Sequence, residues 1–160
     1  MDDPYPGLTE LTAIFLSLDL YFLGINLIII LILFGLSALV SGSEVAYFSL
    51  SQDEIDECKE SDSIPENRIA QLLTNPKRLL ATILILNNFV NIAIVMLSAN
   101  VTWQITGTKD TEGAVLALLT ALVTVAIVFV GEIVPKIYAN QNSQPFAKFT
   151  SGLLSISYGL

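Results

Sequence analysis

The sequence contains no histidine, a single cysteine and few charged residues. Without histidine, the chain cannot form a histidine zinc site, a histidine general base or a Ser-His-Asp triad. Cys58 stands alone in a polar segment, which excludes an intramolecular disulfide and a cysteine metal site. Charged residues make up 14% of the 160 residues and hydrophobic residues 53%. This composition is typical of a membrane protein rather than of a soluble domain.

Basic residues are also missing from the N-terminus. The first nineteen residues carry four acidic side chains and no Lys or Arg, the reverse of the positive start of a cleaved signal peptide. We therefore interpret residues 1–19 as an extracellular lead-in. Its apolar stretch 11–18 is too short to span a bilayer, so it either lies at the membrane interface or extends the first helix.

Three apolar segments are long enough to cross a bilayer. A hydrocarbon core of about 30 Å needs about 20 helical residues, and the matching runs are 20–40, 79–97 and 114–130, the last extending toward Tyr138. We predict an all-α integral membrane protein, with a three-span transmembrane domain over residues 20–140 and short juxtamembrane helices.

The segment 51–78 between the first two spans is predicted to be a helical loop. Ser51 and Glu54 have the spacing of a capping box, which begins a short polar helix. Asn75-Pro76 is typical of an N-cap followed by proline, and so begins the second spanning helix.

The basic residues predict the orientation. Six of the seven lie in the 51–78 loop or at and beyond the end of the third span, and only Lys109 lies on the other side. This asymmetry places the loop and the C-terminus in the cytoplasm and the N-terminus outside. Residues 141–160 are predicted to form a juxtamembrane amphipathic helix. Because the sequence stops within an apolar stretch, we expect it to be a fragment of a longer protein.

An ionisable side chain, Glu132, lies at the end of the third apolar run. A charge at the bilayer centre costs about 2.5–3.5 kcal/mol on insertion scales and is a functional-site hypothesis by default. Pro135 has no N–H, so the Gly131 carbonyl loses its helical partner and is free to bind something else. An i,i+4 ion pair between Glu132 and Lys136 at a helix end is the competing interpretation.

Polar oxygen groups also occur in the first span. Ser37, Ser41 and Glu44 share one helix face. Small-residue helix packing, with each hydroxyl bonded to a carbonyl one turn back, is the alternative to a binding role. Gly42, within the polar cluster 41–44, suggests a loosened helix end with spare carbonyls.

The second span carries Asn87, Asn88 and Asn91 within five residues. Asn87 and Asn91 share a face, where they either hold helices together or serve as ligands. Across the three spans the donors are hydroxyls, amide oxygens, carbonyls and one carboxylate. This is the ligand set of a hard cation such as Mg²⁺, or of Na⁺. A single carboxylate predicts moderate binding, which suits a site that also releases its ion.

Three motifs together, Ser-Gly-Ser-Glu at 41–44, Leu-Asn-Asn-Phe-Val-Asn at 86–91 and Gly-Glu-Ile-Val-Pro-Lys at 131–136, resemble those of the transmembrane domain of the CorC/CNNM magnesium transporters. The resemblance covers about residues 15–160. It implies a three-span homodimer of the bacterial inner membrane, with a dehydrated Mg²⁺ in an inward-facing cavity and cytoplasmic CBS-pair domains after the membrane domain. The ligands it implies, side chains and backbone carbonyls together, are Ser37, Ser41, Gly42, Asn87, Asn91, Gly131 and Glu132.

We therefore predict Mg²⁺ efflux or exchange, with Na⁺ as a candidate coupling ion. The sequence is also similar to a Bacteroidetes branch of the family associated with gliding motility. The alternative function is accordingly a membrane-anchored Mg²⁺ sensor or assembly partner without net transport. An intramembrane hydrolase would need a paired Asp, a Ser with Lys or His, or a zinc motif, so we expect neither an enzyme nor a nucleic-acid partner.

Overall fold

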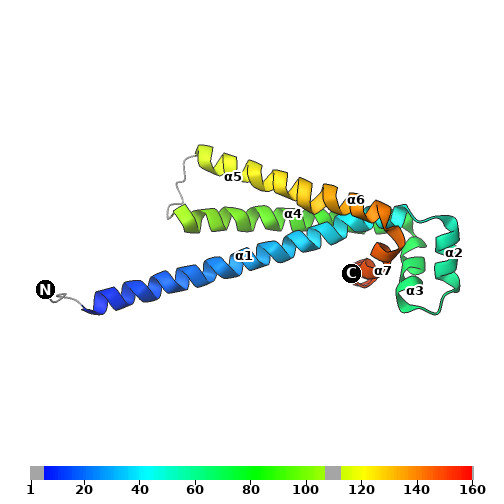
Figure 1. Cartoon of the computed structure of the whole chain (residues 1–160), viewed down its shortest axis with the longest axis horizontal. Coiled ribbons are helices and arrows are strands. Elements are labelled where there is room, and N and C mark those ends of the chain that lie inside the picture. Colours follow the sequence, from blue (N-terminus) through cyan, green and yellow to red (C-terminus); the bar gives the residue numbers. More distant parts are fainter. Residues whose placement is uncertain (1–5, 107–112, 160) are drawn as a thin grey trace.

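The computed structural model describes residues 6–106 and 113–159, which are helical apart from short connections (Figure 1). Within these ranges there is no strand, which confirms the all-α prediction. The elements in chain order are α1 (Pro6–Phe48), α2 (Gln52–Glu60), α3 (Ile64–Leu73), α4 (Pro76–Thr106), α5 (Gly113–Ala126), the π-helix η1 (Ile127–Ile133), α6 (Val134–Gln141) and α7 (Ser143–Tyr158).

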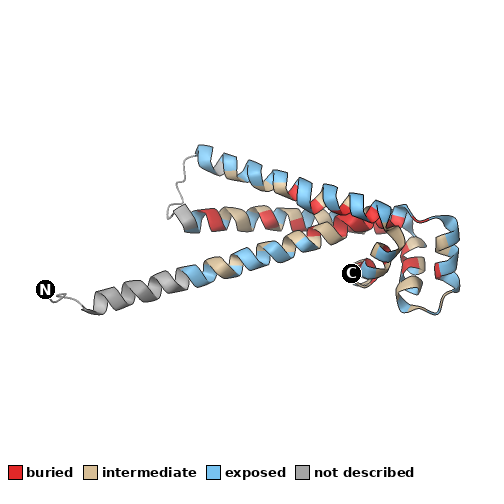
Figure 2. Cartoon of the chain, in the orientation of Figure 1, coloured by how far each residue is buried: buried red, intermediate tan, exposed pale blue. Residues whose placement is uncertain are grey.

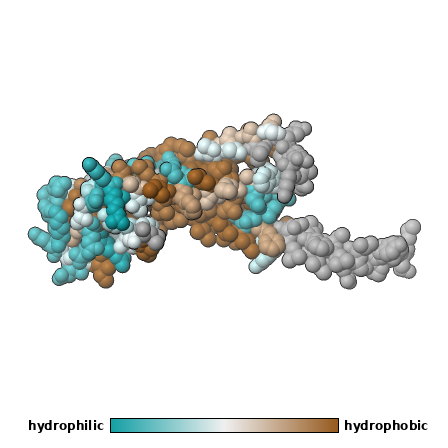
Figure 3. Space-filling view, turned by 180° about the vertical axis from the view of Figure 1, so that it is seen from behind, coloured by the Kyte–Doolittle hydropathy of each residue, from teal (hydrophilic) through white to brown (hydrophobic). Residues whose placement is uncertain are grey.

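Three helical stretches of 29 residues each are long and apolar enough to cross a membrane, namely Leu20–Phe48, Pro76–Gln104 and Gly113–Gln141. Only 11%, 22% and 6% of their most apolar windows are buried, so most of these side chains face outward, as contact with lipid requires. On the face shown in Figure 3, apolar residues gather over the middle of the molecule, and the end formed by α2 and α3 is largely hydrophilic. The chain is therefore a multi-pass membrane protein, as predicted.

Helix α1 decides between two alternatives at its N-terminal end and corrects a prediction at its C-terminal end. It begins at Pro6 and continues for 43 residues, so the 11–18 stretch extends the first helix and no break separates the lead-in from the span. At the other end, the helix runs through 41–44 to Phe48, and the predicted loosened end is wrong. The Ser43 hydroxyl donates to the Leu39 carbonyl at 2.6 Å, which ties this turn together.

The predicted helix caps are confirmed. The Ser51 hydroxyl accepts from the Glu54 N–H at 3.3 Å, and the Glu54 carboxylate accepts from the Ser51 N–H at 2.8 Å. The capping box therefore begins α2 as predicted. The Asn75 side chain likewise accepts from the Arg78 N–H at 3.2 Å and caps the start of α4.

Helix α7 packs against α1 and α3 along one buried face. The Tyr47 hydroxyl of α1 donates to the Ala147 carbonyl at 3.2 Å, and Lys148 forms a 2.6 Å ion pair with Glu66 of α3. Buried residues gather in this region and where α1, α4 and α6 meet (Figure 2). Residues 143–158 are thus helical, as predicted for this segment, and the face with Ala147 and Leu154 is covered by protein, whereas Phe149 and Ile156 are exposed.

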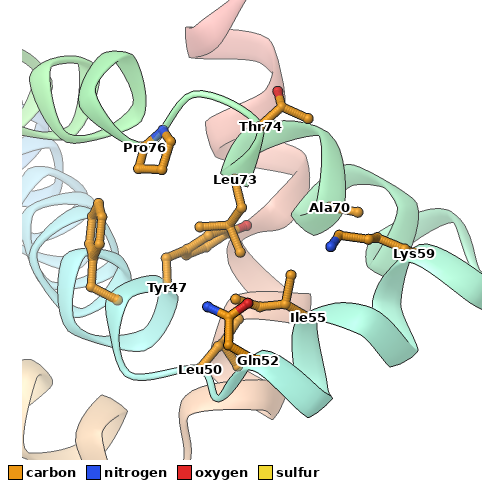
Figure 4. A pocket seen from close by; sticks show the side chains of 10 residues that line it. Tyr47, Leu50, Gln52, Ile55, Lys59, Ala70, Leu73, Thr74 and Pro76 are labelled. Carbon is orange, nitrogen blue, oxygen red and sulfur yellow. The ribbon is translucent and has the colours of Figure 1, made fainter.

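An open pocket of about 400 Å³ lies between the end of α1, α2, α3 and the start of α4. Tyr47 and Leu73 line its apolar side, and Gln52 and Lys59 add polar groups (Figure 4). Lys59 is engaged by Asp56 at 2.7 Å. The pocket shares no residue with the polar network inside the spans.

Candidate cation site between the three spans

Four polar side chains from three elements form one hydrogen-bonded network. The Glu132 carboxylate of η1 accepts from the amide of Asn91 at 3.1 Å and from that of Asn87 at 3.4 Å, both on α4. The Ser37 hydroxyl of α1 donates to the Asn91 oxygen at 2.9 Å and lies 3.4 Å from the Asn87 oxygen. Because a hydroxyl has one proton, Ser37 serves one amide at a time. The structure thus brings together one or two of the polar side chains predicted on each span, namely Ser37, Asn87, Asn91 and Glu132.

Gly131 allows η1 to approach α1 at this point. A Cβ atom at position 131 would lie only 2.9 Å from the Ser37 oxygen, closer than such contacts normally occur. Ser37 itself is fully buried. The glycine is therefore needed for the hydroxyl to reach the amides while Glu132 faces them from the next residue.

The carboxylate is carried by a π-helical segment, which the sequence did not predict. The Val134 N–H donates to the Phe129 carbonyl, five residues back, at the end of η1. Pro135 follows and removes the usual i+4 donor for the Gly131 carbonyl. π-Helical turns are rare and frequently occur at functional sites. The available signals were Gly131 and Pro135, four residues apart at the end of an apolar run.

Lys136 pairs with Glu44 of α1 at 2.8 Å, so the i,i+4 pair with Glu132 is not formed. The π-helical turn holds more residues than an α-helical turn, so residue 136 is not stacked above residue 132. Among residues 6–106 and 113–159, no cation is paired with Glu132. The carboxylate is stabilised by hydrogen bonds alone.

Ser41 continues the polar face of α1 one turn beyond Ser37. Its hydroxyl oxygen is buried and makes no hydrogen bond within the described structure. Leaving such a group unsatisfied costs about 1–3 kcal/mol. A spare oxygen next to a carboxylate network fits a hard-cation ligand. Gly42 lies outside the network and packs against the Phe146 ring, and a Cβ atom at this position would lie 3.3 Å from the Pro135 carbonyl oxygen.

The network is open on one side. A groove of about 350 Å³, lined by Glu132, Asn91, Asn88 and Thr124, lies between α4 and the α5–η1 helix. Neither the groove nor the role of Thr124 followed from the sequence, although Thr124 is one of only two polar residues in the 114–130 run. In the described part of the chain no group of three His, Cys, Asp or Glu could hold a metal, so any ion here is bound mainly by neutral oxygens.

Fold and network define a multi-pass helical membrane protein with a hydrogen-bonded polar network within its spans. Residues 28–160 match the family model of the Cyclin M transmembrane N-terminal domain, and the chain belongs to this family.

Two curated relatives are similar to the chain. A UPF0053 protein of Haemophilus influenzae is 33% identical over 80% of the chain. A chloroplastic DUF21 domain-containing protein of Arabidopsis thaliana is 34% identical over 76% of the chain. The matched regions span 29% and 18% of these proteins, so the chain corresponds to less than a third of either relative.

Proposed function

We propose that the chain binds Mg²⁺ at the network of Ser37, Asn87, Asn91 and Glu132, with Ser41 as a further ligand, and carries this substrate across the bacterial inner membrane. The observation that supports this most is the unpaired charge of Glu132. Within the described residues it has two neutral amide donors and no cationic partner. The buried Ser41 oxygen of α1, which has no hydrogen-bond partner within the described residues, adds a group that a bound ion would satisfy.

Ion binding requires the two amides to turn. In the structure Asn87 and Asn91 present their NH₂ groups to Glu132 and their oxygens to Ser37. A cation at the carboxylate would be repelled by NH₂ donors, so each amide must turn its oxygen toward the ion. The protein thereby gives up the hydrogen bonds from Asn87 and Asn91 to Glu132 and gains contacts between the two amide oxygens and the ion. This exchange limits the net affinity, which suits binding followed by release.

The rest of the proposal concerns topology and assembly. The end carrying α2 and α3 is cytoplasmic, in keeping with the basic residues there, and Na⁺ is the candidate coupling ion. The carbonyls of Gly42 and Gly131 are the candidate backbone ligands. A homodimer and a CBS-pair domain are the proposed partners. Small residues at Gly113, Ala117 and Ala121 recur every fourth position beside an open groove on α5, which supports a helix–helix contact with a second copy.

The test is Mg²⁺ flux into proteoliposomes, with Mg²⁺ affinity measured on the same samples. We expect Glu132→Gln and Asn91→Ala to abolish binding and flux while the protein remains folded. Asn100→Ala is the matched control, since Asn100 lies on α4 outside the network. Unchanged binding in both site variants would refute the assignment. Binding without flux in the wild type would instead favour a Mg²⁺ sensor.

A further inference from the structure

A second cavity lies between α4 and α5, beyond the groove beside Glu132. The groove itself is lined by Thr124 and Val95 as well as by the site residues. A smaller cavity of about 40 Å³ follows, lined by Ser98, Thr102, Thr120 and the same Val95. Because Val95 lines both, the groove and the small cavity adjoin each other. Together they extend from Glu132 away from α2 and α3. In Figure 1, α4 and α5 separate toward the start of α5, in the same direction.

The residues of this series form one face of α4. Asn91, Val95, Ser98 and Thr102 are spaced i, i+4, i+7 and i+11, so they lie along one stripe. At 1.5 Å per residue the stripe is about 16 Å long, roughly the outer half of a span. Helix α5 runs antiparallel and supplies the facing hydroxyls. The stripe therefore begins at a ligand of the proposed site and ends near the outer end of α4.

The hydroxyl groups are arranged to present oxygen. Thr102 donates its proton to the Ser98 carbonyl at 2.9 Å, and Thr124 donates to the Thr120 carbonyl at 2.8 Å. With its proton committed to the backbone, the Thr124 hydroxyl keeps its lone pairs for the groove. Such bonds also serve simply to hide hydroxyls in membrane helices, and Thr82 makes one with Arg78 at 3.0 Å. Thr82 lines neither the groove nor the small cavity. The other hydroxyls differ from it in that they line one of these two adjoining cavities.

The small cavity is large enough for about one water molecule and too small for a hydrated ion. Val95 and Val123 both line it, and apolar constrictions of this kind close pathways by excluding water. We infer that the outer half of the ion path runs between α4 and α5, from Glu132 past Thr124, Ser98, Thr120 and Thr102, and is closed in this structure at Val95 and Val123. This inference rests on the proposed transport function.

The first test separates binding from passage. The double variant Ser98→Ala, Thr102→Val removes two hydroxyls of the path and none of the site. We expect its Mg²⁺ affinity to stay within about twofold of the wild type and its flux to fall about tenfold, which corresponds to a barrier raised by about 1.4 kcal/mol. Thr82→Val removes the same type of hydroxyl–carbonyl bond on α4 and should leave both quantities unchanged.

The second test needs no flux. Cys58 is the only cysteine, so Cys58→Ala provides a background for single thiols. Ag⁺ is about as small as the single water molecule that the cavity admits and binds thiolates that it reaches through water, so Ser98→Cys should react at least about tenfold faster than Leu122→Cys. Leu122 lies at a similar distance from the outer end of its helix, is 57% exposed and faces lipid.

The outcomes distinguish the path from the function. Equal, slow labelling of the two thiols, or wild-type flux in the double variant together with no flux in Glu132→Ala, would overturn the path and leave the transport proposal standing. Absence of flux from the wild type would remove both. Fast labelling of Ser98→Cys with a selective loss of flux supports the path.

Discussion

Gly131→Ala should weaken Mg²⁺ binding without unfolding the protein. The added Cβ atom would lie 2.9 Å from the Ser37 hydroxyl oxygen and 3.5 Å from the Ser37 Cβ. Ordinary contact begins at 3.4 Å, so the oxygen must withdraw by about 0.5 Å or rotate away. Either movement disturbs its 2.9 Å hydrogen bond to Asn91. Overpacking of this kind costs about 1–3 kcal/mol.

The cost is concentrated at the site because the hydroxyl is the nearest atom. If the misplaced hydroxyl accounts for about 1.4–2.8 kcal/mol of binding, Kd rises roughly ten- to a hundredfold. Isothermal titration with Mg²⁺ in detergent measures the change, and thermal unfolding checks the fold. Gly35→Ala is the control, since its added Cβ meets nothing within 4 Å. Wild-type affinity in Gly131→Ala would refute the role assigned to the glycine.

Three further predictions concern charges and the thiol outside the network. Glu44→Gln leaves the positive charge of Lys136 without its partner on the α2–α3 side of the site. This charge repels Mg²⁺, so the association rate should fall a few-fold at low salt. Stopped-flow binding measures the rate, and the double variant with Lys136→Gln should restore it. The hydrogen bond from Lys148 lowers the pKa of Glu66 below 4.5, so the ion pair stabilises the fold above the ordinary pKa and this stabilisation is lost as pH falls through the lowered value. Glu66→Gln should therefore have a lower melting temperature at pH 7, and its melting temperature should depend less on pH below 4.5. Parallel pH dependences of the two melting temperatures would refute this. Burial, followed by the nearby Glu66 charge, raises the pKa of the Cys58 thiol, so maleimide should label it at least about tenfold faster after denaturation than in the native protein at pH 7.

The elements that were predicted correctly depend on neighbouring residues in the chain. Ser51 and Glu54 satisfy each other's backbone groups within one turn, and Asn75 caps the helix that begins at Pro76. A run of about 20 apolar residues similarly has few alternatives to a spanning helix. Such signals act over a few residues, so they can be read without knowledge of the tertiary structure.

The features that were missed depend on distant contacts. The cluster 41–44 looks like a loosened helix end, but Gly42 packs tightly against Phe146, which is more than a hundred residues away in the chain. The partner of Lys136 is set by the π-helical register and by α1, so the competing i,i+4 pair with Glu132 could be excluded only from the structure. Asn87, Asn91 and Glu132 could be singled out because amides and a carboxylate are costly in lipid, whereas the hydrogen bonds that connect them required the helix packing.

The network also explains how a chain with a carboxylate in its spans is stable before an ion binds. Desolvating Glu132 costs about 2.5–3.5 kcal/mol on insertion scales, and hydrogen bonds to a charged group contribute about 1.5–3 kcal/mol each. Two amide donors are therefore sufficient to offset the cost. When an ion binds, the same amides turn and become oxygen ligands. The ion therefore has to replace the hydrogen bonds that satisfy Glu132 in the ion-free protein. A lysine partner for Glu132 would stabilise the chain as well, but it would occupy the position of the cation and could not turn aside as an amide does.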